Sequence, residues 1–145
     1  MVSKELCCSL ILSIAILQLY AIVGTKWSSN KLGQMSLWYE CNGNTCGETY
    51  RMPDTGNMYE LNLVRGLVCV SFVLTLLALY ITCTNKMPSF RLASHLLVLS
   101  SILTALALFV WMHNFNMIGN KNVKFGPPIY ALGVGVLLSI PVAYY

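Results

Sequence analysis

Four long stretches of the chain contain no Asp, Glu, Lys or Arg, and they constrain the fold more than any other feature. They cover residues 6–25, 66–85, 92–120 and 125–145. A helix needs about 20 apolar residues to cross the hydrocarbon core of a bilayer, so each stretch is long enough for one crossing. The pattern predicts an all-α membrane protein, a four-helix transmembrane bundle that forms a single domain over residues 1–145. The predicted spans are 6–25, 64–84, 92–112 and 128–145.

Composition excludes the soluble alternatives. Of the 145 residues, 57% are hydrophobic and only 10% are charged, against roughly 25% charged in an ordinary soluble domain. A soluble chain this short cannot bury so much apolar surface, and disorder requires the opposite composition. The net charge of +4 is scattered, without the basic stripe of a nucleic-acid-binding surface. The expected partner is the lipid bilayer, with no nucleic acid.

The first span has one alternative, a cleaved signal peptide. Its apolar run of about 18 residues is long for such a peptide, and residues 21–24 make a poor cleavage site. At the other end of the chain, Pro127 and Pro128 suit the first turn of a helix, and Pro141 predicts a kink within it. We therefore expect the first span to be retained and the last to be helical.

Four spans place both termini on one side and two loops, 26–63 and 113–127, on the other. Charge and cysteine usage disagree about which side is which. The loops hold more Lys and Arg than the termini and the short connection, and the positive-inside rule would then place the loops in the cytoplasm. Cysteine usage indicates the reverse, and we follow it, because several of those basic residues lie beside acids. The expected topology has cytoplasmic termini and extracellular loops.

The cysteine argument rests on Cys41 and Cys46 in the first loop. An Asn-Gly pair between them favours a tight turn, and runs able to pair as strands lie on either side, at 37–40 and 48–51. A hairpin there brings the two sulfurs within bonding reach, and such a bond persists only in an oxidising compartment. We predict a Cys41–Cys46 disulfide within a small extracellular antiparallel sheet. The alternative is two free thiols in a cytosolic loop.

Three other cysteines fall at the predicted cytoplasmic ends of helices, where S-palmitoylation commonly occurs. They are Cys7, Cys8 and Cys83. The alternative role for these three residues is packing within the bundle. Cys69 lies in the middle of a helix and is a weaker candidate.

Polar and small residues within the spans indicate how the helices pack. We expect Gln18 and His95 to be buried and to form interhelical hydrogen bonds. Ala131, Gly135 and Ser139 recur every four residues on the last helix, a spacing that allows close backbone approach in membranes. We interpret this stripe as internal packing rather than an oligomer face.

The first loop and the start of the second helix contain an ordered set of residues. In chain order they are Trp27, Leu37, Trp38, Cys41, Cys46 and Arg65. This order resembles the signature of the superfamily that contains claudins, peripheral myelin protein, epithelial membrane proteins and calcium-channel gamma subunits. Residues 63–67 look like the claudin segment in which an Arg opens the second helix, and residues 125–130 are similar to the start of the fourth. The resemblance covers the whole four-span topology, with its specific motif in the first loop.

The sequence departs from the family pattern in several places. Ser36 stands where the family usually has Gly or Asn, the two cysteines are closer together, and the first loop is shorter, so we expect a smaller sheet. The valine motif by which many claudins bind PDZ scaffolds is missing, and no PDZ scaffold is expected. Neither loop has an Asn-x-Ser/Thr glycosylation site; only residues 44–46, Asn-Thr-Cys, offer a rare variant.

The resemblance implies that the tryptophans hold the sheet against the extracellular ends of the helices. Trp27 and Trp38 each supply an apolar ring and one N–H able to bond to a carbonyl. An unpaired guanidinium at membrane depth is expensive, so we expect Arg65 to bond to loop carbonyls or to an acid such as Glu60 or Glu40. The alternative for this arginine is snorkelling to the headgroups.

Catalytic chemistry is not expected. The chain has no Cys-x-x-Cys, no His-Glu-x-x-His and no Gly-rich phosphate loop. Its two histidines lie at opposite ends of the third span and cannot share a metal. We therefore expect no enzyme activity, no cofactor and no metal.

The resemblance leaves two roles open. In the first, the protein organises cell–cell contacts or a paracellular barrier at the plasma membrane, side by side with itself or related membrane proteins, and loop acids line an ion path. The candidate acids are Glu40, Glu48, Asp54 and Glu60. In the second, it is an auxiliary subunit of an ion channel or receptor, or a membrane organiser similar to the myelin proteins. Both roles place a multi-pass protein in the plasma membrane, the first at cell–cell junctions.

Overall fold

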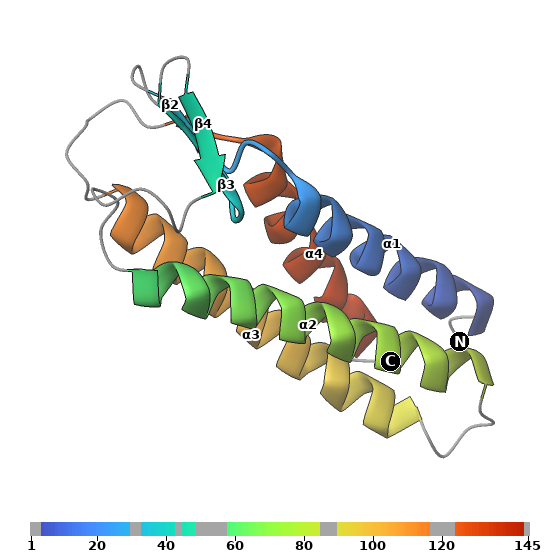
Figure 1. Cartoon of the computed structure of the whole chain (residues 1–145). Helices are drawn as coiled ribbons and strands as arrows, with labels where there is room; N and C mark the ends of the chain where they lie inside the picture. The colour runs from blue at the N-terminus through green and yellow to red at the C-terminus, as the bar shows by residue number, and fades with distance from the viewer. Residues whose placement is uncertain are drawn as a thin grey trace.

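The computed structural model describes residues 4–29, 33–42, 45–48, 58–84, 90–116 and 124–143. Within these residues the protein has four α-helices and one small antiparallel sheet (Figure 1), which confirms that part of the predicted fold. The helices are α1 (Lys4–Val23), α2 (Met58–Thr84), α3 (Phe90–Asn116) and α4 (Pro127–Ala143). The strands are β1 (Ser28–Ser29), β2 (Gly33–Met35), β3 (Tyr39–Asn42), β4 (Thr45–Glu48) and β5 (Lys124–Phe125).

Three of these helices are long and apolar enough to cross a membrane. Their apolar segments are Lys4–Val23, Tyr59–Thr84 and Arg91–His113. The fourth, α4, is apolar but has 17 residues, at the lower limit of the roughly 17–25 that a crossing requires. Many large apolar side chains lie on the outside of the bundle, and so much exposed apolar surface would be unfavourable in water. Length and composition therefore suggest a membrane protein.

Helices α2 and α3 extend beyond their predicted spans into the loops, whereas α1 ends at Val23, before the predicted end of its span at residue 25. Residues 58–63, assigned to the first loop from the sequence, form the first turns of α2. Residues 113–116, assigned to the second loop, continue α3. The length of a charge-free stretch reflects the thickness of the hydrocarbon core that the helix crosses. The helix itself can be longer, because its backbone hydrogen bonds continue into the polar interface. The two loops are therefore shorter than predicted.

The four helices close into a bundle in which α1 and α3 each pack against both α2 and α4. The buried side chains form two apolar clusters, one at each end of the bundle. The cluster nearer the sheet consists of Ala21, Trp27, Leu37, Leu61, Val64, Val68, Ala107, Trp111, Ile129 and Leu132. The cluster at the other end consists of Ile11, Ala78, Ala93, Leu97 and Val142. On every helix these two groups are separated by several residues, and the gap holds buried polar side chains, together with Ile14 and Ala15 on α1.

These polar side chains form a buried hydrogen-bonded layer. Gln18 of α1 is 2% exposed, and its Nε2 donates to Ser100 Oγ at 3.2 Å and Thr104 Oγ1 at 3.4 Å on α3. Ser100 Oγ in turn donates to the carbonyl of Ser71 on α2 at 2.8 Å and lies 2.8 Å from Thr75 Oγ1. The predicted interhelical role of Gln18 is therefore confirmed.

The small residues of α4 face the interior, as predicted. Ala131 and Ser139 are buried, and the Ser139 hydroxyl hydrogen-bonds with that of Ser101 on α3. A methyl group placed on Gly135 would lie 3.9 Å from Ile14 of α1, so the two helices approach closely there. This stripe is a helix-packing surface within the chain.

The prediction for His95 is wrong. Its side chain is exposed on the outer face of α3, whereas Ala93 and Leu97 on either side are buried. With 3.6 residues per turn, a position two residues from a buried one lies roughly 200° around the helix. His95 therefore points away from the bundle, and only the phase of the helix reveals this.

The sheet has the strand order β4-β3-β2-β1-β5, and all of its pairs are antiparallel. The first loop contributes four strands, and β5 comes from the second loop, which the sequence analysis did not predict. Ser28 pairs with Phe125 and Ser29 with Lys124. Two-residue strands have no periodicity to read in the sequence, so this pairing emerges only in the folded chain.

Candidate functional site

The candidate site is the sheet anchor, which we define as Trp27, Leu37, Trp38 and Arg65. It lies where the sheet meets the ends of the helices (Figure 1). The last carbonyls of any helix have no partner within it, and α1 ends at Val23. The anchor supplies donors for two of these carbonyls.

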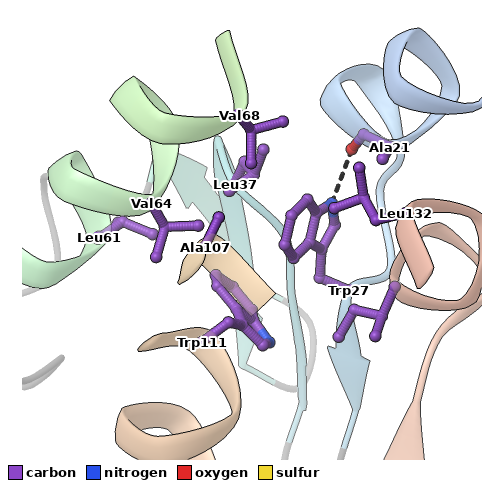
Figure 2. Packing of buried hydrophobic residues seen from close by; sticks show 10 residues of the cluster. Ala21, Trp27, Leu37, Leu61, Val64, Val68, Ala107, Trp111 and Leu132 are labelled. Carbon is purple, nitrogen blue, oxygen red and sulfur yellow. Dashed lines mark hydrogen bonds between the residues drawn. The ribbon is translucent and has the colours of Figure 1, made fainter. Parts of the chain in front are cut away.

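Each donor is an indole N–H. Trp27 Nε1 donates to the carbonyl of Ala21 at 2.7 Å, drawn as a dashed line in Figure 2. Trp38 Nε1 donates to the next carbonyl, that of Ile22, at 2.8 Å. A buried carbonyl without a partner is costly, so the two tryptophans both complete the end of α1 and attach the loop to it.

Trp27 connects the sheet to the core of the bundle. Its side chain is fully buried, and its ring lies 4.9 Å from that of Trp111 on α3 at a tilt of 59°, a favourable aromatic arrangement. Its backbone N–H donates to Met35 at 2.9 Å, and its carbonyl accepts from Gly126 at 2.8 Å. One residue thus holds α1, β2 and the start of α4 in register.

Gly126 is a site residue that the sequence analysis did not single out. A Cβ atom at this position would overlap the carbonyl of Lys26, so only glycine allows the backbone N–H to reach Trp27. Gly24 has a similar role, because a Cβ there would overlap the ring of Pro128. A glycine between an irregular segment and a helix indicates such close backbone approach, and this was the available signal.

Arg65 joins the anchor from α2. Its Nε donates to the carbonyl of Leu37 at 2.6 Å, and its terminal NH1 donates to Asn62 Oδ1 at 2.9 Å. Its guanidinium carbon lies 5.0 Å from the centre of the Trp38 ring, within the range of a cation–π interaction. Of the alternatives that the sequence left open, the structure shows the bond to a loop carbonyl.

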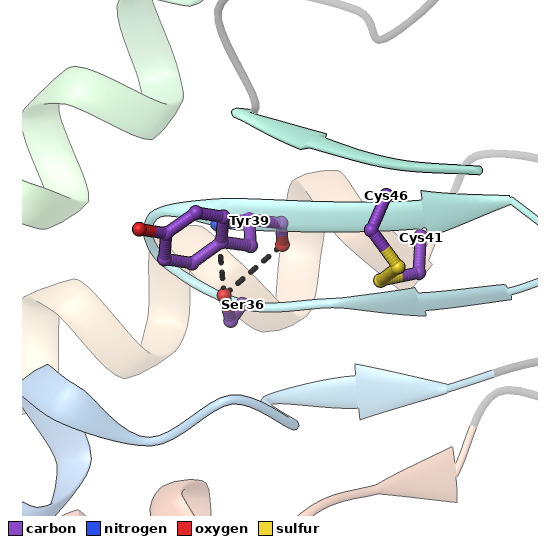
Figure 3. Close-up of a disulfide and its surroundings, with 4 residues drawn as sticks. All are labelled: Ser36, Tyr39, Cys41 and Cys46. Atoms are coloured by element: carbon purple, nitrogen blue, oxygen red, sulfur yellow. Dashed lines mark hydrogen bonds between the residues drawn. A yellow bond between two sulfur atoms is a disulfide. The ribbon is translucent and has the colours of Figure 1, made fainter.

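Ser36 shapes the turn that presents Leu37 and Trp38. Its N–H donates to the carbonyl of Tyr39 at 2.8 Å. Its hydroxyl accepts from the N–H of Tyr39 and donates to the carbonyl of the same residue, each at 3.0 Å (Figure 3). A serine hydroxyl that bonds to nearby backbone stabilises such turns. This explains how serine serves at a position where the claudin-like sequences that the chain resembles usually have Gly or Asn.

The hairpin that follows contains the predicted disulfide. Cys41 of β3 pairs in register with Cys46 of β4, and the two sulfurs are bonded (Figure 3). Compared with the sequence prediction, β3 starts later in the chain, at Tyr39 rather than Leu37, and β4 starts earlier, at Thr45 rather than Glu48. Leu37 and Trp38 therefore lie in the preceding turn, which frees their side chains to contact the helices.

The four acids proposed to line an ion path have different surroundings. Glu40 is 8% exposed, so its side chain is turned away from solvent, and Glu60 is half-buried in the first turn of α2. Glu48 belongs to β4, opposite Tyr39, and Asp54 lies outside the described residues. Among the residues that the structure describes, no group of three or more His, Cys, Asp or Glu is placed to hold a metal ion.

The cysteines proposed for palmitoylation also differ in exposure. Cys7 is 2% exposed and packs inside the bundle, which corresponds to the alternative role. Cys8 is half-buried and Cys83 is exposed. Cys69, in the middle of α2, is half-buried.

Comparison with known proteins adds no family to this description. No protein-family model matches the chain, and a search of curated proteins finds no relative. The claudin-like interpretation therefore stays a prediction, based on the ordered residues of the first loop.

Proposed function

We propose that this chain is a claudin-like integral membrane protein that organises cell–cell contacts or a paracellular barrier through its sheet. The observation that carries the proposal is the sheet anchor. Trp27, Leu37, Trp38 and Arg65 were singled out as a family signature, and these four residues meet at one place. Their contacts perform the task that the resemblance implies, which is to hold a sheet against helix ends.

The disulfide supports the proposed orientation. A bond between Cys41 and Cys46 persists in an oxidising compartment, which supports an extracellular sheet and cytoplasmic termini in the plasma membrane. The charge distribution favours the opposite orientation. That rule is a statistical preference, whereas a disulfide bond requires an oxidising compartment in order to persist.

An adhesive role requires a surface that keeps its shape when a partner binds. The indoles attach the sheet to α1, Arg65 attaches it to α2, and the backbone of Gly126 attaches it to the start of α4. Attachment to three helices prevents the sheet from pivoting, and a preorganised surface loses less entropy on association. The exposed aromatic rings of Tyr39 and Tyr59 are of the type that dominates binding surfaces.

The orientation can be tested with two substitutions at one position. Cys46→Ser turns residues 44–46 into Asn-Thr-Ser, a glycosylation site that is used only in the secretory lumen. Cys46→Ala breaks the same bond without creating the site, so it is the matched control. We expect a glycosidase-sensitive mass increase in the serine variant alone. If neither the serine variant nor the alanine variant is glycosylated, the proposed orientation is contradicted.

The role can be tested in cells that lack junctions, in cultures mixing expressing with non-expressing cells. We expect the protein to concentrate where two expressing cells meet and to stay diffuse where one cell lacks it. Tyr39→Ser should weaken this enrichment, and Gln34→Ser, at another exposed sheet position, should not. A diffuse signal at every contact would reject the adhesive role. Recruitment only after co-expression of a channel or receptor would favour the auxiliary-subunit alternative.

A further inference from the structure

Two free cysteines from different helices are in contact at the end of the bundle opposite the sheet. Cys8 lies in the second turn of α1 and Cys83 is the penultimate residue of α2. Their sulfur atoms are 2.8 Å apart, although 75 positions separate them in the sequence. Lys4 Nζ donates to the carbonyl of Cys83 at 2.9 Å, which provides a second link between the same two helix ends.

We propose that Cys8 and Cys83 form a reversible dithiol–disulfide couple that hydroperoxides oxidise. A disulfide bond is about 2.05 Å long, so the sulfurs need to approach by only about 0.8 Å and the helices keep their arrangement. Cys83 is exposed and Cys8 is half-buried, so an oxidant reaches the first and the second lies directly behind it. Cys7, although adjacent in sequence, is buried and takes no part.

The chemistry balances with hydrogen peroxide as the oxidant. The Cys83 thiol loses its proton and its sulfur attacks one peroxide oxygen; the O–O bond breaks, leaving a sulfenic acid and one water molecule. The Cys8 thiol then attacks that sulfur, the S–S bond forms and the S–O bond breaks, and the proton lost by Cys8 joins the departing hydroxide as a second water molecule. Two thiols and one peroxide give one disulfide and two waters, and a cytosolic dithiol reverses the reaction.

The location suits a reversible couple. The anchor bonds to the last turn of α1 and the first turns of α2, whereas the thiol pair joins the other ends of these two helices. In the orientation proposed above, the pair therefore faces the reducing compartment, where thiols persist until they are oxidised. Reversal by a cytosolic dithiol rests on that proposed orientation. The contact between the sulfurs and its oxidation by peroxide depend neither on the orientation nor on an adhesive role, so the thiol count can fail independently of both.

The test uses the full-length protein in native membranes. After exposure to hydrogen peroxide the chain is denatured, and the remaining thiols are counted by gel shift with a polyethylene-glycol maleimide. We expect two of the four free cysteines to become unreactive and to recover after mild reduction. Peptide mapping should find a single new link, Cys8 to Cys83. The disulfide should also raise the thermal midpoint by roughly 5–10 °C, because it closes a long loop.

Four variants provide the controls. Cys8→Ser and Cys83→Ser should each keep all their remaining thiols after peroxide, whereas Cys7→Ser and Cys69→Ser should lose two thiols as the natural chain does. Four thiols surviving in the natural chain, or a link that joins two chains, would overturn the proposal. A hydroxylamine-sensitive acyl group on Cys8 or Cys83 in untreated membranes would also overturn it, because one thiol would then be blocked. The mapping on the natural chain decides the question even if a variant folds poorly.

Discussion

Replacement of Trp27 by phenylalanine tests whether the indole N–H, and not merely an aromatic ring, holds the sheet. The substitution removes the 2.7 Å bond to the carbonyl of Ala21 in a fully buried position. An unsatisfied buried carbonyl costs about 1–3 kcal/mol, and the smaller ring loses about 1 kcal/mol of burial against Trp111. We expect Trp27→Phe to lower the free energy of unfolding by about 2–4 kcal/mol.

Trp38→Phe is the matched comparison. Trp38 makes the same kind of bond to the next carbonyl of the helix, but its side chain is 38% exposed. Water can therefore replace the lost donor at the carbonyl of Ile22. We expect Trp38→Phe to lower the free energy of unfolding by about 0.5–1 kcal/mol. The two variants remove the same chemical group and differ mainly in burial, so the ratio of their effects tests the reasoning.

Thermal unfolding in detergent provides the measurement. Cys7 is 2% exposed and reacts with a fluorogenic thiol dye only as the bundle opens, in a background where the other free cysteines, Cys8, Cys69 and Cys83, are serine. At about 3 °C per kcal/mol for a chain of this size, Trp27→Phe should lower the midpoint by about 6–12 °C and Trp38→Phe by less than about 3 °C. Equal shifts, or a larger shift for Trp38→Phe, would refute the argument that burial sets the cost.

Substitutions at three further residues are expected to have measurable effects in the same assay. Arg65→Met keeps the apolar stem but removes the bond to Leu37 and the cation–π contact, so it should lower the free energy of unfolding by about 2–4 kcal/mol. Arg65→Lys should recover less than half of this loss, because lysine lacks the planar guanidinium group. A full recovery by lysine would show that charge alone matters. Gly126→Ala should lower the free energy of unfolding by about 3 kcal/mol, because the added Cβ must displace the carbonyl of Lys26. An unchanged thermal midpoint would contradict the close approach of the two backbones. Gln18→Leu should change the free energy of unfolding by less than about 1 kcal/mol, because the hydroxyl groups that Gln18 contacts retain other hydrogen bonds. A much larger decrease would show that the polar layer depends on this amide.

Much of the fold could be predicted from the sequence because it depends on local chemistry. The four helices follow from the length of the charge-free stretches, and the hairpin follows from an Asn-Gly turn between two cysteines, which now pair as Cys41 and Cys46. The role of Gln18 between helices was also predictable, since an amide in an apolar segment requires partners. Each of these inferences uses residues that are neighbours in the chain or a property of one segment.

The tertiary structure decided which distant groups meet. Arg65 had several acceptable partners, and the turn at Ser36 selected the carbonyl of Leu37. Strand β5, the close approach at Gly126 and the contact between the two cysteine sulfurs join segments far apart in the sequence. Such contacts depend on the rotational phase of each helix, the register of each strand and the path of each loop. A shift of one residue in a strand register moves every side chain of that strand to the opposite face. The sequence by itself therefore determined the four helices, the disulfide-linked hairpin and the chemistry of their side chains. Packing determined strand β5 and which of those chemical groups work together.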